Sequence, residues 1–113
     1  MPPRQSLGEL ELVVLLALMR AGEDAYGAII RAEIAATTGR DVTPGAIYPT
    51  LDRLEQRGLV RSHIGDPTGE RGGRARRHFV LLEPGLQEVR RAWRQYATLA
   101  KGLESALDRG RAK

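Results

Sequence analysis

The longest uninterrupted apolar run in this 113-residue sequence, Leu12–Met19, constrains the fold more than any other feature. Ser6 and Glu9 have capping-box spacing ahead of it and Gly22 is a stop signal, so the run belongs to a helix. A helix that is apolar on all sides must be covered on more than one side. A chain of this length buries one core, which covers one side, so we expect a partner chain to cover the other.

The same run argues against a membrane protein. Its eight residues fall far short of the roughly 20 that a membrane span needs, and no secretory signal peptide is recognisable. The sequence has no cysteine, which excludes disulfides, thiolate nucleophiles and cysteine metal sites. We therefore expect a soluble, cytoplasmic protein with no membrane contact.

Two further helices are predicted before residue 58. The first of them runs from about Ala25 to Thr38, with Asp24 as its N-cap and Gly39 as its stop. Its apolar stripe consists of Tyr26, Ile29, Ile30 and Ile34. The other starts with Thr43 as N-cap and Pro44 at the first helical position, a strong start signal. It ends at Gly58, and its core stripe is Ile47, Leu51 and Leu54.

A β-hairpin is predicted after these helices. Leu59–Ile64 and Ala75–Leu82 have the pattern of strands, with Phe79 and Leu81 on one face, and the glycine-rich segment between them has the composition of a loop. Three helices followed by a hairpin are typical of a winged helix-turn-helix. The predicted fold class is therefore mainly α with a small β-hairpin, and residues 1–83 form the winged helix-turn-helix domain.

The remaining segment, residues 84–113, predicts one long C-terminal helix of about 24 residues. Apolar residues recur through it with heptad spacing, and a helix roughly 36 Å long overhangs so small a core. We expect it to be a dimerisation helix in one compact unit with the first domain. The predicted dimer interface consists of Leu86, Val89, Trp93, Tyr96, Ala100, Leu103 and Leu107.

Charge is distributed unevenly along the chain. The formal net charge is +4, made up of −2 over residues 1–42, +2 over residues 43–83 and +4 over residues 84–113. Four arginines fall within seven residues of the predicted wing without an acidic residue among them: Arg71, Arg74, Arg76 and Arg77. Such a patch is typical of nucleic-acid binding. The alternative is a solvated basic loop.

The third helix is the candidate DNA-reading element. With its core stripe turned inward, Gly45, Pro49, Asp52 and Gln56 point outward. Small residues allow close approach to a groove, and the helix start at Thr43 and Pro44 suits phosphate. Pro49 costs a helical hydrogen bond, which indicates either a tolerated bend or a shaped outer face.

The flanks of this helix leave alternatives open. Tyr48 is either an aromatic residue at the edge of the core or a phosphate donor through its hydroxyl. Arg53 is either a DNA contact or part of a surface ion pair with Asp52 or Glu55. Asp52 itself faces outward, where a carboxylate repels phosphate unless it accepts a hydrogen bond from a cytosine amino group.

Several strings resemble the PadR family of bacterial transcriptional regulators, in its short form. They are LGELELVVLLAL near the start, AYG at 25–27, TPGAIYPTLDRLEQRGLV at 43–60, ERGGRARRHFVL at 70–81 and EPG at 83–85. The resemblance implies a nucleoid-associated homodimer that binds a palindromic operator, usually as a repressor. It also implies that the first and last helices build the dimer interface. Some members bind flat aromatic compounds between subunits, which by position implicates Leu12, Val13, Trp93 and Tyr96.

Other functions are disfavoured by the residues themselves. His63 and His78 lack the partners of a catalytic triad or metal site, and no phosphate-binding glycine loop is present. We expect no catalysis, no cofactor and no metal. The main alternative is a winged-helix protein-interaction module that does not bind DNA. Trp93 is either a plain interface anchor or a ligand platform.

Overall fold

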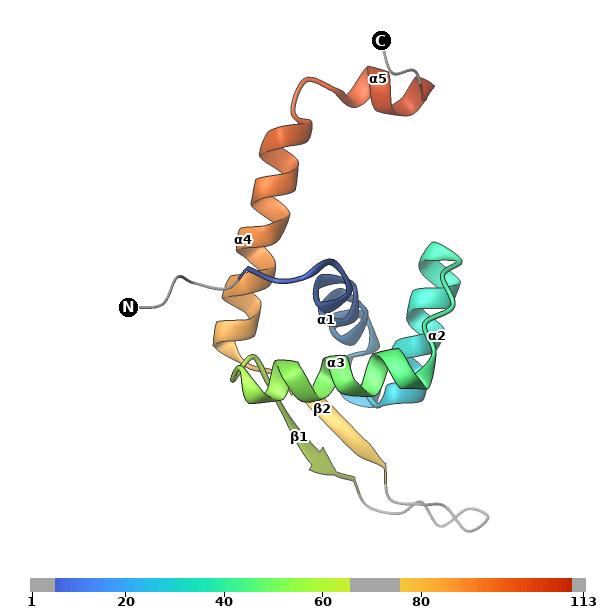
Figure 1. Cartoon of the computed structure of the whole chain (residues 1–113), viewed down its shortest axis with the longest axis vertical. Helices are drawn as coiled ribbons and strands as arrows, with labels where there is room; N and C mark the ends of the chain where they lie inside the picture. The colour runs from blue at the N-terminus through green and yellow to red at the C-terminus, as the bar shows by residue number, and fades with distance from the viewer. Residues whose placement is uncertain (1–5, 66–75, 111–113) are drawn as a thin grey trace.

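The computed structural model of the chain describes residues 6–65 and 76–110. Three helices come first, a two-stranded hairpin follows, and two helices end the chain (Figure 1). A short 3-10 helix, η1, joins the first two helices. In chain order the elements are α1 Glu9–Ala21, η1 Gly22–Asp24, α2 Gly27–Thr38, α3 Pro44–Gln56, β1 Val60–Ile64, β2 Arg77–Leu81, α4 Glu83–Ala100 and α5 Glu104–Arg109.

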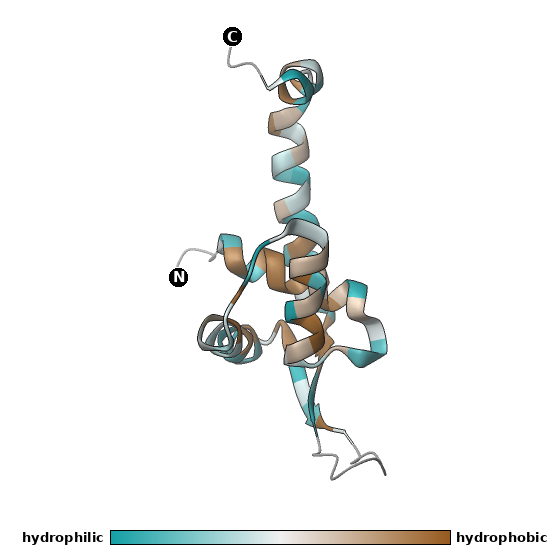
Figure 2. Ribbon diagram, turned by 90° about the vertical axis from the view of Figure 1, so that its right-hand side faces the viewer, coloured by the Kyte–Doolittle hydropathy of each residue, from teal (hydrophilic) through white to brown (hydrophobic). Residues whose placement is uncertain are grey.

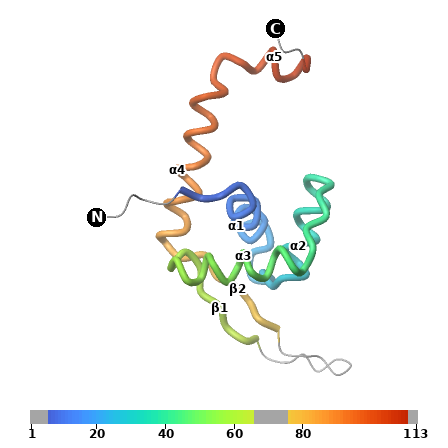
Figure 3. Tube along the Cα trace, in the orientation of Figure 1, coloured from blue at the N-terminus to red at the C-terminus, as the bar shows by residue number. Residues whose placement is uncertain are grey.

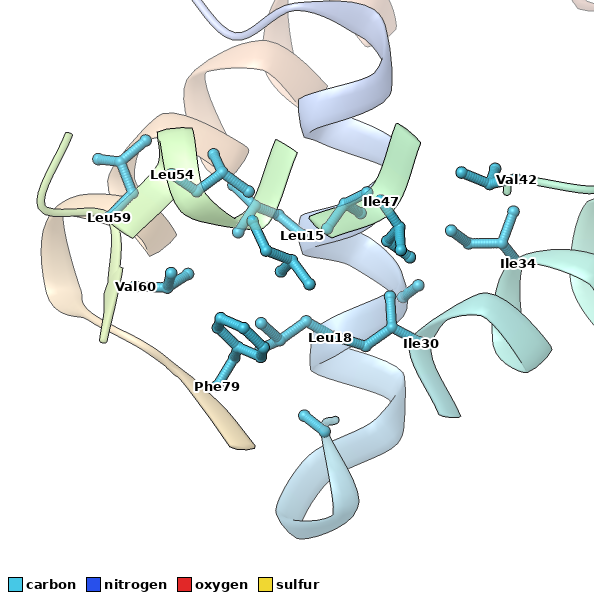
Figure 4. Packing of buried hydrophobic residues seen from close by; sticks show 14 of the residues in the cluster. Leu15, Leu18, Ile30, Ile34, Val42, Ile47, Leu54, Leu59, Val60 and Phe79 are labelled. Atoms are coloured by element: carbon cyan, nitrogen blue, oxygen red, sulfur yellow. The ribbon is translucent and has the colours of Figure 1, made fainter. Parts of the chain in front are cut away.

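One apolar core holds α1, α2, α3 and the hairpin together. On α1 the fully buried residues are Val14 and Leu15, and from the hairpin Phe79 enters the same cluster (Figure 4). The predicted core stripe of α3, Ile47, Leu51 and Leu54, is completely buried. The predicted winged-helix architecture is therefore confirmed.

The other side of α1 is uncovered within one chain. Leu16 and Met19 are exposed on this side, although they belong to the apolar run Leu12–Met19. Together with Val13 and Ile34 they line an apolar groove of about 450 Å³ between α1 and α2. In Figure 2 the hydrophobic residues gather in the body of the molecule. Where α4 extends beyond the body, hydrophobic and hydrophilic residues are mixed.

The hairpin is antiparallel and pairs Val60 with Leu81 and Ile64 with Arg77. It is joined to the helices by a short extended segment before α2. The amide of Phe79 donates to the carbonyl of Ala25 over 2.8 Å, and Tyr26 forms a bridge with His78. This third, minimal strand fixes the hairpin against the helical body.

Three predicted helix boundaries are wrong. The N-cap of the first helix is Gly8 rather than Ser6, so the helix begins at Glu9, and the Gly8 amide donates to the Glu11 carboxylate at 2.8 Å. The second begins at Gly27 rather than at Ala25, because residues 25 and 26 are extended and pair with β2. Its predicted N-cap, Asp24, ends η1 instead.

The third error concerns the C-terminal segment, where a single long helix was expected. The chain turns after α4 at Lys101 and Gly102 before α5 begins (Figure 3). Gly102 has a φ of 88°, a conformation that breaks a helix and that glycine adopts without a steric penalty. Leu103 and Leu107 therefore lie outside the helix that carries Trp93 and Tyr96, and the heptad pattern is interrupted.

The entry to α4 is tightly packed, which gives a test of the fold. Gly85 is buried, and a Cβ atom there would overlap the backbone oxygen of Leu59 and the side chain of Leu81. Gly85→Ala should therefore lower the free energy of unfolding by at least about 2 kcal/mol, since backbone must move to relieve the overlap. Thermal and urea denaturation followed by circular dichroism measure the loss.

Gly45→Ala is the matched control. A Cβ atom at Gly45 meets only the Thr43 hydroxyl at 3.8 Å. Alanine there should stabilise the helix by up to about 1 kcal/mol, because it restricts the unfolded chain. Equal effects of the two substitutions would contradict the close approach of α4 to Leu59.

Candidate nucleic-acid interface

The outer face of α3 is exposed opposite its buried stripe. As the helical spacing predicts, Gly45, Pro49, Asp52 and Gln56 are all exposed. At its start Thr43 is extended (φ −72°, ψ 158°) and occupies the N-cap position, although its side chain makes no capping hydrogen bond. The exposed first turn presents the positive end of the helix dipole, which attracts phosphate.

Pro49 is accommodated without interrupting α3, which runs continuously through it. The next residue, Thr50, is buried, and its hydroxyl donates to the Ala46 carbonyl at 2.8 Å. The Arg53 guanidinium donates to that same hydroxyl at 3.1 Å. Among the described residues Arg53 forms no ion pair, so the alternative of a pair with Asp52 or Glu55 is wrong, and its positive charge is available at the surface.

Tyr48 packs at the edge of the core, which is one of the two alternatives for it. Its ring and hydroxyl lie over Gly27 at the start of α2, where a Cβ atom would overlap them. The side chain nevertheless stays 41% exposed. Tyr48 therefore packs at the edge of the core and still presents its surface beside the outer face of α3.

Tyr26, which lies just before α2, holds Arg76 in place at the loop end of the hairpin. Its guanidinium stacks on the Tyr26 ring at 4.6 Å from the centroid and donates to the Tyr26 hydroxyl at 2.7 Å. On the same side of the hairpin His78 meets the Tyr26 ring edge-on and stacks on His63. Arg76 is thus an exposed, oriented cation. The other two wing arginines, Arg71 and Arg74, lie outside the described residues.

Arg77 points the other way, toward α3. It donates to Asp52 at 2.9 Å and to Glu55 at 2.6 Å, and its guanidinium lies 4.8 Å from the centroid of the Phe79 ring. The Ser62 hydroxyl and amide donate to the same Glu55 carboxylate. Hydrogen bonds from Ser62, then from Arg77, hold the pKa of Glu55 below its usual value of about 4.5, although burial acts in the opposite direction.

Residues 15–91 match the transcriptional regulator PadR-like family. The chain belongs to this family. Solved structures agree with the assignment. A PadR family regulator from Eggerthella lenta is 29% identical, with a TM-score of 0.64 over 88% of this chain and 86% of that one. A search of curated proteins finds no match.

Two more distant structures share the fold. A PadR family regulator from Clostridium difficile has a TM-score of 0.73 at 21% identity, over 88% of this chain and 99% of that one. A winged-helix DNA-binding protein from STIV has a TM-score of 0.65 at 18% identity, over 84% of this chain and 95% of that one. Family and fold are those of transcription regulators rather than of enzymes.

The residues predicted to form the interface of this PadR-like chain are divided by the structure. Val89 is buried in the chain's own core and Leu86 is partly buried. Trp93 and Tyr96 are 62% and 53% exposed on the part of α4 that leaves the body. Of the remaining predicted interface residues, Ala100 is partly buried, whereas Leu103 and Leu107 are exposed.

The predicted effector residues do not form one pocket within a single chain. Val13 lines the groove between α1 and α2, whereas Tyr96 lines a separate depression along α4. Leu12 is partly buried at the edge of the core. Among the described residues, no group of three acidic or histidine side chains converges to hold a metal. No described helix is long and apolar enough to cross a membrane.

Sequence reasoning missed three contributors to this surface. Gly27 makes room for Tyr48, Tyr26 supports Arg76, and Ser62 supports Glu55. The sequence predicts Tyr26 inside a helix, and this prediction conceals its position beside the hairpin. The alternation of strand residues does contain a usable signal, because it places Arg77 on the same face as Phe79 and hence toward the helices.

Proposed function

We propose that this PadR-like chain is a transcriptional repressor that binds a palindromic operator as a homodimer. The observation that carries the proposal is the outer face of α3. It is exposed, small at Gly45 and Pro49, and flanked by Arg53 and Tyr48. A helix with this profile fits a major groove closely, and its N-terminal turn suits a phosphate.

The hairpin supplies the second set of DNA contacts in this proposal. Arg71, Arg74 and Arg76 contact flanking phosphates or the minor groove, and Arg76 is already oriented by Tyr26. Each neutralised phosphate releases counterions and strengthens the dependence of affinity on salt. A winged-helix module that binds only proteins has little use for an exposed arginine at this position without an acidic partner among the described residues. Arg76 therefore favours DNA over the protein-interaction alternative.

The proposal predicts salt-dependent binding of duplex DNA. In a gel shift at low salt, the chain should retard a duplex that carries the region upstream of its own gene. Arg74→Ala with Arg76→Ala should weaken binding to this duplex and to random DNA about equally. The slope of log affinity against log salt should fall by about 0.9 for each lost phosphate contact.

Arg90→Ala with Arg94→Ala on α4 removes the same two charges from exposed positions outside α3 and the hairpin, and it serves as the control for net charge. Unchanged affinity of the hairpin variant would contradict contact by the wing. Absence of any retardation by the wild-type chain at low salt would contradict the DNA-binding function itself and favour the protein-interaction module.

A homodimer accounts for the apolar surface that one chain leaves uncovered. Soluble monomers seldom expose many large apolar side chains together. Here most of them occur on two elements that the family resemblance assigns to the interface, α1 and the C-terminal segment. They are Leu16, Met19, Trp93, Tyr96, Leu99, Leu103 and Leu107.

Leu99 gives the sharpest test of the dimer, because it is the most exposed of these residues at 75%. Leu99→Asp should convert the dimer to a monomer in sedimentation velocity, since it would bury an unpaired charge in the interface. Thr98→Asp is the matched control, one position away on an exposed polar side chain, and should remain dimeric. A dimeric Leu99→Asp variant would show that this face of α4 is not the interface.

We also propose that a planar aromatic effector binds between the subunits, against Trp93 and Tyr96, with Leu12 and Val13 opposite. Trp93 is the only tryptophan, so its fluorescence reports on this region alone. Planar aromatic dyes should quench it in the wild-type chain and lose this effect in monomeric Leu99→Asp. Flat emission across several dyes would contradict the effector site and leave Trp93 as an interface anchor.

A further inference from the structure

Two carboxylates lie on the helix that is proposed to enter DNA. Asp52 and Glu55 are three residues apart on α3, hence on one side of the helix. The Asp52 side chain is 51% exposed and that of Glu55 is 33% exposed. Facing a phosphate backbone, an unneutralised pair of this kind would repel the ligand that the helix is meant to bind.

Arg77 forms ion pairs with both carboxylates at once, so that its single positive charge screens the pair. One terminal nitrogen of its guanidinium donates to Asp52 at 2.9 Å and the other donates to Glu55 at 2.6 Å. The Arg77 guanidinium packs against the Phe79 ring, which is itself buried. Both terminal nitrogens are therefore engaged within the chain, in charge-assisted hydrogen bonds that are stronger than neutral ones.

A phosphate contact by Arg77 would have to use its other N–H donors, since a guanidinium has five, and the phosphate would compete with two carboxylates for one positive charge. The group formed by Arg77, Asp52 and Glu55 has a formal charge of −1, and without Arg77 it has −2. Arg76, one residue earlier, differs from Arg77 in its position and in its ion pairing. It lies on the opposite face of the hairpin, on Tyr26, and makes no ion pair among the described residues.

We infer that Arg77 is a screening residue of the DNA interface and not one of its phosphate contacts. It acts through Asp52 and Glu55, whose combined charge it reduces from −2 to −1 where α3 approaches the DNA backbone. The inference rests on the proposed DNA-binding function and assigns Arg77 a role different from that of the other wing arginines. Loss of Arg77 weakens binding because two carboxylates become unscreened, not because a contact is lost.

The test is a cycle of substitutions measured by fluorescence anisotropy, with a labelled duplex that carries the upstream region of the chain's own gene. Arg77→Met keeps an apolar stem over Phe79 and removes the charge. In the wild-type background it should weaken binding at least about tenfold, as expected when like charges face each other across an interface. In a background of Asp52→Asn with Glu55→Gln, the same substitution should cost less than about twofold.

Direct contact predicts the opposite pattern. With both acidic partners neutralised, Arg77 is free to bind phosphate, so its loss would cost as much as in the wild type or more. An undiminished loss in the neutral background therefore overturns the inference. Arg61→Met is the matched control, because Arg61 is exposed on the paired strand and has no ion pair among the described residues. Its effect should be the same in both backgrounds.

Two further measurements keep the result decisive. Thermal denaturation of every variant, followed by circular dichroism, sets a temperature at which all are folded, and affinities are compared there. If Arg77→Met is not folded at any temperature, Arg77→Gln replaces it in the same cycle. Failure of the wild-type chain to bind the duplex at low salt contradicts the proposed function, whereas a wild type that binds without the rescue contradicts only the role of Arg77.

Discussion

The position of the hairpin depends on Phe79. Its side chain is only 2% exposed within the core formed by α1, α2 and α3, and its amide donates to the carbonyl of Ala25, in the extended segment before α2. A fully buried aromatic side chain contributes more apolar contact than any other single residue of this hairpin. Because the ring and the backbone bond act at one residue, the hairpin and the helices are held in a fixed relation.

That relation determines what each arginine of the hairpin can do. Successive residues of a strand point to opposite faces, and Phe79 must face the core. Arg77 is two residues away and so faces α3 and its carboxylates, whereas Arg76 and His78 face Tyr26. Two adjacent arginines of equal charge thus have different surroundings. A count of basic residues treats them alike, and only the strand register separates them.

The fold could be predicted from the sequence where local signals and core packing agree. The start of α3 at Pro44 and the burial of Ile47, Leu51 and Leu54 are examples, because the N-cap, the proline and the apolar spacing all specify one helix. Prediction failed where a long-range contact overrides local preference. Residues 25 and 26 have the composition of a helix start, but they are extended because they pair with a strand more than fifty residues later.

The end of α4 shows a different kind of failure, in which periodicity was given more weight than backbone conformation. The apolar spacing continues through Leu103 and Leu107, but Gly102 in a left-handed conformation ends the helix between them and Trp93. A heptad pattern shows which residues would share a face if the helix continued. The pattern does not show whether the helix continues. Leu99, which the heptad omits, is more exposed than any residue that the heptad includes. The apolar surface of the C-terminal segment is therefore set by where α4 ends, because Leu103 and Leu107, both exposed, lie beyond that end.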